Sequence, residues 1–136
     1  MDEKRYARGK AIRDESYGTE GIKYWKQLRE ICPTHADAIH EYAFGTIWDR
    51  PLLDPKTRHL LTVALAVSLD ATHEVMQHTR GALNFGASQD EVIETILHCA
   101  PYVGFPRTNH GLRAAKSIFD QWEEKREEWK PRRAAE

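Results

Sequence analysis

The sequence predicts an all-α domain of six to seven helices. Apolar side chains recur at helical spacing along almost all of the 136 residues. No segment shows the sustained two-residue alternation, bounded by turn residues, that marks a half-buried strand. The length, a hydrophobic content of 40% and the lack of a repeat or low-complexity linker suit one ordinary domain, so residues 1–136 are expected to form a single domain.

The N-terminal third is expected to hold three helices. An amphipathic pattern that includes Tyr6 ends near Gly18, and residues 21–31 fit a second helix that stops before Pro33. Apolar residues then continue at helical spacing over residues 36–47, which predicts the third helix.

Residues 48–53, Trp-Asp-Arg-Pro-Leu-Leu, interrupt this pattern, since the residue before a proline avoids the α region. Asp54 and Pro55 then provide an N-cap and a proline at the first helical position, so a helix is expected to begin there. Its residues 60–69 are apolar almost all round, which is typical of a helix that protein surrounds on every side. We expect it to be the central core helix.

The second half continues with helices of more ordinary pattern. A break at residues 70–72 precedes a helix closed by Gly86, and Ser88 with Glu91 forms a capping box that starts the next helix, which runs to about Tyr102. Gly104 separates it from a last helix.

The last helix begins apolar and becomes charged. Residues 120–136 are expected to form a charged helical end and tail, with residues 130–136 frayed. Trp122 and Trp129 lie seven residues apart on one helical face, which favours packing of both rings onto this subunit or a neighbour. A partner-binding arm is the alternative interpretation.

Composition excludes several classes of function. The 20 basic and 21 acidic residues nearly cancel, so no field would gather nucleic acid or an anionic membrane. No stretch approaches the roughly 20 apolar residues of a membrane span, and no signal peptide is expected. The cysteines, Cys32 and Cys99, form no disulfide framework or Cys-x-x-Cys pair, so a soluble protein of the reducing cytoplasm is expected.

One helix carries a candidate acid/base residue. His73 and His78 are five residues apart and diverge around the helix, so the two-histidine zinc pattern, with its spacing of four, does not apply. Glu74 and His78 share a face, and the carboxylate is expected to hydrogen-bond the imidazole and hold its tautomer and charge. Because Ala71 and Val75 lie on the same stripe, we expect His78 to face packed protein. A surface Glu–His pair without a function is the alternative.

Two arginines are candidates for anion binding. Arg50 lies in the turn between helices, and Arg58 lies with His59 in the first turns of the core helix, where a cation gains nothing from the helix dipole. The planar guanidinium binds carboxylates bidentately, which favours a substrate clamp. Simple ion pairs with Glu41 or Asp54 are the alternative.

Aromatic residues complete the candidate pocket. Tyr42, Trp48 and Tyr102 could form its walls, although each could equally be a core or interface residue with its polar end satisfied. The glycines match no phosphate-binding pattern, and no metal-ligand spacing is present. Buried Glu, Arg and His side chains therefore favour acid/base chemistry without a cofactor on an anionic organic molecule.

Several of these segments together resemble the carboxymuconolactone decarboxylase family over about residues 5–119. They are Glu41–Gly45, Trp48–Leu53, Thr57–Leu61, Glu74 with His78, Arg80–Asn84 and Tyr102–Pro106. The wider superfamily includes alkylhydroperoxidase-like proteins with a Cys-x-x-Cys before the helix histidine. Here Ala71 and Glu74 occupy the aligned positions, which argues against peroxidase or disulfide reductase activity.

The resemblance implies an all-helical subunit that assembles into trimers or hexamers, with active sites near subunit contacts and no metal or organic cofactor. The reaction it implies converts 4-carboxymuconolactone to 3-oxoadipate enol-lactone and CO2 in protocatechuate catabolism, through a dienolate that is then protonated. His78, held by Glu74, would deliver the proton. Arg50 or Arg58 would bind a carboxylate or the enolate, and the three aromatic residues would line the pocket.

Two departures from the family leave the substrate open. His59 and His98 stand where an uncharged residue is expected in the decarboxylases, and residues 108–113 are more polar than expected. Such changes would reshape the substrate pocket. A paralogous lyase or isomerase acting on another carboxylated lactone or keto acid would keep the same signature, and so would a non-catalytic oligomeric binding protein.

Overall fold

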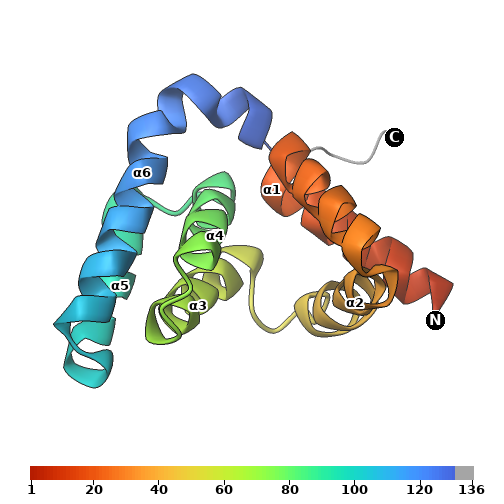
Figure 1. Ribbon diagram of the computed structural model, residues 1–136, viewed down its shortest axis with the longest axis horizontal. Coiled ribbons are helices and arrows are strands. Elements are labelled where there is room, and N and C mark those ends of the chain that lie inside the picture. Colours follow the sequence, from red (N-terminus) through yellow and green to blue (C-terminus); the bar gives the residue numbers. More distant parts are fainter. Residues whose placement is uncertain (131–136) are drawn as a thin grey trace. The chain divides into compact units, whose positions relative to one another are not determined.

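The computed structural model describes residues 1–130, which form helices joined by short turns with no strand among them (Figure 1). The predicted all-α class is therefore confirmed. The predicted frayed tail falls mostly on residues 131–136, which lie outside the described residues. The chain divides into two compact units, one of Met1–Leu53 with the residues from Glu127 onward, and one of Asp54–Arg126.

The first unit is built on a long kinked helix, α1 (Glu3–Ile31). The predicted end of a helix near Gly18 is observed as a kink, and the segments on either side continue as one element. Gly18 has φ 59° and ψ −149°, a conformation that costs glycine little and other residues much. A Cβ atom there would also lie 2.3 Å from the Lys130 carbonyl oxygen. Glycine is therefore required at this kink.

The rest of the first unit differs from the predicted α-helix over residues 36–47. Helix α2 (Pro33–Ala38) is short, and a π-helix, η1 (Ile39–Trp48), follows it. Residues five apart lie above one another in a π-helix, so His40 and Gly45 both face α1. A Cβ atom on Gly9 would lie 1.8 Å from the His40 carbonyl oxygen, so the two backbones touch here. The wider π turn thus allows a close helix crossing.

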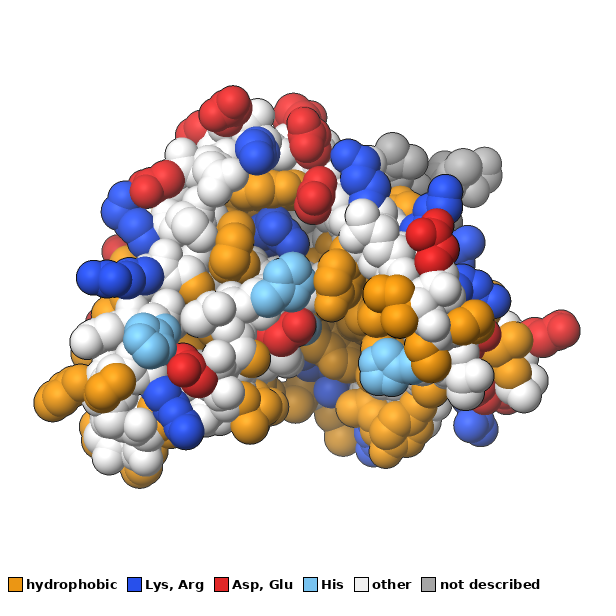
Figure 2. All heavy atoms as spheres, in the orientation of Figure 1, with side chains coloured by type: hydrophobic (Ala, Val, Ile, Leu, Met, Phe, Trp, Pro, Cys, Tyr) orange, Lys and Arg blue, Asp and Glu red, His pale blue; other side chains and the backbone are white. Residues whose placement is uncertain are grey.

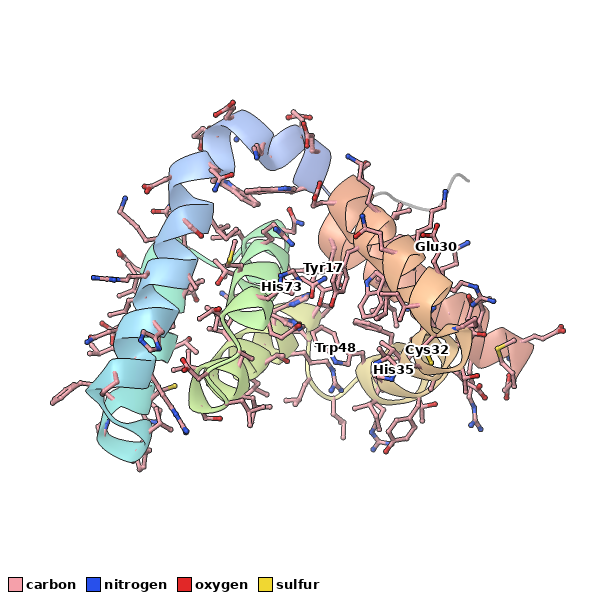
Figure 3. All side chains as sticks on the ribbon, viewed as in Figure 1. Tyr17, Glu30, Cys32, His35, Trp48 and His73 are labelled. Carbon is pink, nitrogen blue, oxygen red and sulfur yellow. The ribbon has the colours of Figure 1, made fainter. Side chains whose placement is uncertain are left out.

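Aromatic side chains form the core of the first unit. Tyr17, Trp25 and Phe44 are buried with Ile12. The Trp25 and Phe44 rings meet edge-on, with 6.2 Å between their centroids. Cys32 lies where α1 joins α2, near Glu30 and His35, and it forms no disulfide (Figure 3).

The second unit begins with the predicted caps. Asp54 Oδ1 accepts a hydrogen bond of 2.7 Å from the Thr57 amide and starts α3 (Pro55–Ser68). Ser88 and Glu91 form the expected reciprocal capping box at the start of α5 (Gln89–Val103). These local signals placed both helix starts correctly.

Helix α4 (Thr72–Asn84) lies beside α3, and α6 (Phe105–Trp129) follows the left-handed Gly104. The core of this unit is aliphatic. It contains Val63, Val67, Val75, Val92, Ile96 and Ala115. A Cβ atom on Gly111 would lie 2.7 Å from Val67 Cγ2, so α6 packs closely on α3.

The prediction that protein surrounds α3 on every side is wrong for the single chain. Val63 and Val67 are buried, but Leu61, Leu65 and Leu69 are 50%, 61% and 76% exposed. These three residues are four apart and form an apolar stripe along the outer face of α3. The all-round apolar pattern therefore combines a core-facing side with a second apolar side that this chain does not cover.

The C-terminal part of α6 is charged, as predicted. Figure 2 shows acidic and basic side chains gathered over this end of the helix, and Glu123, Glu124 and Arg126 are exposed. Trp129, in contrast, is buried. This agrees with packing of Trp129 within the chain.

Candidate active site

The candidate acid/base residue, His78, lies on α4 and is buried, as predicted. The side chains of His78 and His59 meet between α4 and α3, with 3.1 Å between their Nδ1 atoms. The ring centroids are 5.3 Å apart and the ring planes are tilted by 45°. His59 is fully buried and His78 is 9% exposed. The structure thus pairs His78 with a second imidazole.

The space for the His59 ring depends on two residues at the end of α4. Phe85 stacks on the ring with a centroid distance of 5.6 Å and an interplanar angle of 22°. Gly81 lies against its edge, and a Cβ atom there would lie 2.2 Å from His59 Cε1. The ring is therefore held by stacking on one side and by a backbone without a side chain on another.

Both imidazoles are neutral near pH 7. Burial, followed by the positive charge of Arg80, lowers the pKa of His78 to about 3. Burial, followed by the charge of a protonated His78, holds the pKa of His59 well below its usual range. A second positive charge between α3 and α4 is therefore unfavourable. In the free protein, the pKa of His78 therefore lies well below neutral pH.

Glu74 is half-buried one turn before His78 on α4. Its role in orienting the imidazole stays a prediction. The Nδ1 atom of His78 faces His59 on α3. Glu41 and Asp54, the alternative partners of the two arginines, each accept a hydrogen bond from a backbone amide.

Two further predicted site residues belong to the same unit as His78. Arg58 is half-buried on α3, directly before His59 in the sequence. Tyr102 is 77% exposed near the end of α5, and its ring lies 5.5 Å from that of His98. A cavity of about 290 Å³ between α3 and α5 is lined by Thr57, Leu60, Leu61, Ala64, Thr95 and His98. The side chain of His98 therefore faces this cavity.

The other three predicted site residues belong to the first unit. Tyr42 is 65% exposed on η1. Trp48, labelled in Figure 3, packs on Phe44 with 5.5 Å between ring centroids. Arg50 follows in the turn, where its amide donates to the Ile47 carbonyl oxygen. Their roles in substrate binding stay predictions.

A buried cluster of polar and charged side chains lies in the first unit. The Arg13 guanidinium is 2.9 Å from His40 Nε2 and pairs with Asp14. Burial, followed by Arg13, lowers the pKa of His40 to about 4, so this imidazole is also neutral and accepts from the arginine. The cluster satisfies Arg13 inside an aromatic core.

Comparison with known proteins identifies the family. The family model described as "Carboxymuconolactone decarboxylase family" matches residues 33–117, which include α3, α4 and α5 and therefore both histidines of the pair. The chain belongs to the carboxymuconolactone decarboxylase family. The resemblance found in the sequence is thereby confirmed.

Two relatives of this family member are named decarboxylases. The chain is 34% identical over 119 residues to 4-carboxymuconolactone decarboxylase of Acinetobacter baylyi, which covers 87% of this chain and 89% of the relative. It is also 34% identical over 126 residues to nitrosuccinic acid decarboxylase npaB of Metarhizium robertsii. This alignment covers 90% of this chain and 87% of the relative. Relatives of equal identity thus carry the names of different substrates.

Two properties of the described residues bear on the class of site. Nowhere in residues 1–130 do three or more His, Cys, Asp or Glu side chains gather in a group that could hold a metal ion. Within the same residues, no helix combines the length and apolar character needed to cross a membrane.

Proposed function

We propose that this protein is a decarboxylase for a small carboxylated substrate, in which His78 delivers the proton that replaces CO2. The buried imidazole pair of the second unit is the observation that carries the proposal, because enclosed, mutually oriented titratable groups are typical of acid/base sites. The family and its two named decarboxylases support the same class of reaction.

The preferred substrate is 4-carboxymuconolactone. The electrons of the breaking carbon–carboxylate bond move toward the lactone carbonyl and form a dienolate, while the carboxylate leaves as CO2. One proton then adds to the ring carbon, which gives 3-oxoadipate enol-lactone. The substrate supplies the electron sink, so the protein has to bind, orient, exclude water and transfer a proton.

The charge of the substrate explains how a neutral His78 becomes an acid. An anion that binds beside the imidazole favours its protonated form and raises its pKa. His78 would therefore take up a proton when the substrate binds. In the free protein, burial and Arg80 keep the site uncharged. Glu74 would orient the substrate or a water near the pair, because its carboxylate is half-buried on the same face of α4.

The remaining assignments follow the sequence. Arg50 or Arg58 would bind a carboxylate, and Trp48, Tyr42 and Tyr102 would line the pocket. Assembly into trimers or hexamers would bring further surfaces to the site, and the exposed stripe on α3 supports such an assembly. We place the reaction in the cytoplasm, as the unpaired cysteines favour.

A nitro-substituted succinate is the second candidate substrate, because one named relative decarboxylates nitrosuccinic acid. A nitro group accepts the electrons of the departing carboxylate as a lactone carbonyl does, so the same proton donor serves both reactions. A paralogous lyase or isomerase acting on another carboxylated lactone or keto acid is a broader form of this alternative. A non-catalytic oligomeric binding protein would turn over neither substrate.

Replacement of His78 tests the proposal. The wild type, His78→Ala and a control, His110→Asn, would be assayed with 4-carboxymuconolactone generated in situ and with nitrosuccinate, following CO2 release. His110 pairs with the exposed Asp70 on the surface, away from the imidazole pair. We expect kcat to fall by roughly 10²- to 10⁴-fold in His78→Ala, the range for loss of a general acid. Equal kcat in all three proteins would refute the role of His78.

A further inference from the structure

The Nδ1 contact between His59 and His78 requires a defined arrangement of protons. Each neutral imidazole carries one N–H group and one bare nitrogen. Two bare Nδ1 atoms at 3.1 Å would repel each other, and two N–H groups would clash, so one ring donates and the other accepts. The donor ring must then have a bare Nε2, and the acceptor ring must carry its proton on Nε2. The tautomers of the two rings are therefore linked.

We infer that His59 is a positioning residue that fixes the tautomer of His78 and passes a proton to it through the Nδ1 contact. This inference rests on the proposed function, because it assigns His59 a role in the same proton transfer. When His59 donates, His78 carries its proton on Nε2, the nitrogen on the opposite side of the ring from His59.

The proton balance of the relay closes. With one extra proton, each ring carries N–H on Nε2 and the two Nδ1 atoms share one further proton, so the positive charge extends to His78. The Nε2 proton of His78 moves to the substrate carbon, and the shared proton stays on Nδ1 of His78. Both rings end neutral, the carbon–hydrogen bond is formed, and the extra proton has been consumed. The next proton enters from solvent at Nε2 of His78 with the next anionic substrate, and the Nδ1 proton is then shared with His59 again, which restores the starting state.

The fold maintains the geometry that the relay needs. His59 is fully buried, stacks on Phe85 and fits against Gly81, so its ring has little freedom to turn. A buried polar ring costs free energy unless its nitrogen atoms are hydrogen-bonded. An apolar ring of similar shape would fill the same space at lower cost. The hydrogen bond to His78 offsets part of this cost and gives the buried imidazole a defined partner.

Nitrogen NMR tests the positioning role without any substrate. The ¹⁵N shifts of the histidine side chains would be measured in the wild type, His59→Phe, His59→Gln and the control His110→Asn. We expect His78 in the wild type to show one tautomer, with one protonated and one bare nitrogen. His59→Phe keeps the ring shape but removes the hydrogen bond, so the His78 signals should move toward the average of two tautomers. His59→Gln, whose amide still donates, should keep the single tautomer.

Kinetics test the relay. We expect kcat to fall at least about tenfold in His59→Phe with little change in KM, and His59→Gln to recover only part of it, because an amide orients His78 but relays no proton. In mixtures of H2O and D2O, the wild-type rate should reflect two protons in motion and the His59→Gln rate one. Thermal unfolding of each variant would show that it is folded.

The possible results distinguish the role of His59 from the proposed decarboxylase activity. A single His78 tautomer and wild-type kcat in His59→Phe would overturn the inference. Full recovery of kcat in His59→Gln would overturn the relay and leave only positioning. If the wild type released no CO2 from either substrate, the proposed function would fail, while the NMR result would still decide whether His59 fixes the tautomer.

Discussion

At the scale of single residues, the most informative contact joins His78 to His59. The sequence indicated that His78 is buried and needs a partner, and both points agree with the structure. It pointed to Glu74 as a partner because residues four apart share a helical face, and that role stays a prediction. The structure adds a partner that lies 19 residues earlier on another helix. Helical spacing reveals partners on one helix, whereas contacts between helices depend on packing that spacing alone does not show.

The sequence alone showed that His59 is unusual, but it did not show which residues surround its ring. His59 departed from the uncharged residue expected in these decarboxylases, and Gly81 lies in a matched segment. The structure links the two, because the missing side chain of Gly81 provides the space for the His59 ring. A histidine on one helix and a glycine on a neighbouring one are thus parts of a single feature.

The low pKa of His78 predicts how stability depends on pH. The folded protein binds a proton at His78 with a pKa of about 3, whereas an unfolded histidine has a pKa of about 6.5. The unfolded state therefore takes up the proton first as the pH falls. The contribution of His78 to stability is fully present above about pH 6.5 and is lost progressively down to about pH 3.

Urea denaturation of the wild type and His78→Gln at pH 7.5 and 5.5 measures this effect. Between these pH values, the wild type should lose more unfolding free energy than the variant, by on the order of 1 kcal/mol for one proton. Identical losses in both proteins would show that His78 is not held neutral by the fold.

At the scale of helices, local signals predicted most boundaries and missed one helix type. The caps at Asp54 and Ser88 and the break at Gly18 depend on residues close in sequence, so they were visible without a structure. The π-helix η1 was not, because its apolar residues also fit an α-helix. Its wider turn accompanies the contact between Gly9 and Gly45, which are far apart in the chain.

This crossing predicts a strong effect of a small substitution. A Cβ atom on Gly45 would lie 2.1 Å from the Arg5 carbonyl oxygen, a backbone atom that cannot move aside independently. We expect Gly45→Ala to destabilise the protein by roughly 3 kcal/mol, the upper part of the usual range for overpacking. Chemical denaturation of the variant measures the change.

Gly86→Ala is the matched control. Gly86 has φ 90° but no heavy atom within 4 Å of the added Cβ, so only backbone strain of about 1 kcal/mol is expected. Equal destabilisation by the two substitutions would contradict the account of a close crossing between α1 and η1.

At the scale of the whole molecule, the exposed apolar stripe on α3 is unusual for a protein that acts alone. Leu61, Leu65 and Leu69 form it, and Leu97 on α5 is also half-exposed. Apolar surface of this kind marks an interaction site. The family resemblance implies an oligomer, and we propose that a second copy of the chain covers the stripe. Assembly would then bury the second apolar side of α3, as the apolar pattern of this helix predicts.

Leu65→Glu tests this arrangement, because it places a charge in the middle of the stripe. We expect the oligomer of the wild type to dissociate at least partly, as measured by light scattering after size exclusion. Lys23→Glu, on the exposed surface of α1, should leave the mass unchanged. A wild type that is already monomeric, or a Leu65→Glu variant with the wild-type mass, would contradict the proposed interface.

The central claim is that this protein exchanges a carboxylate for a proton through His78. The most direct measurement is CO2 release in D2O by the wild type and His78→Ala, with 4-carboxymuconolactone or nitrosuccinate as substrate and mass spectrometry of the product. The account predicts that the wild type releases one CO2 for each deuterium added to carbon, at a rate that His78→Ala largely loses. Equal rates of CO2 release and deuterium addition in the two proteins would contradict it.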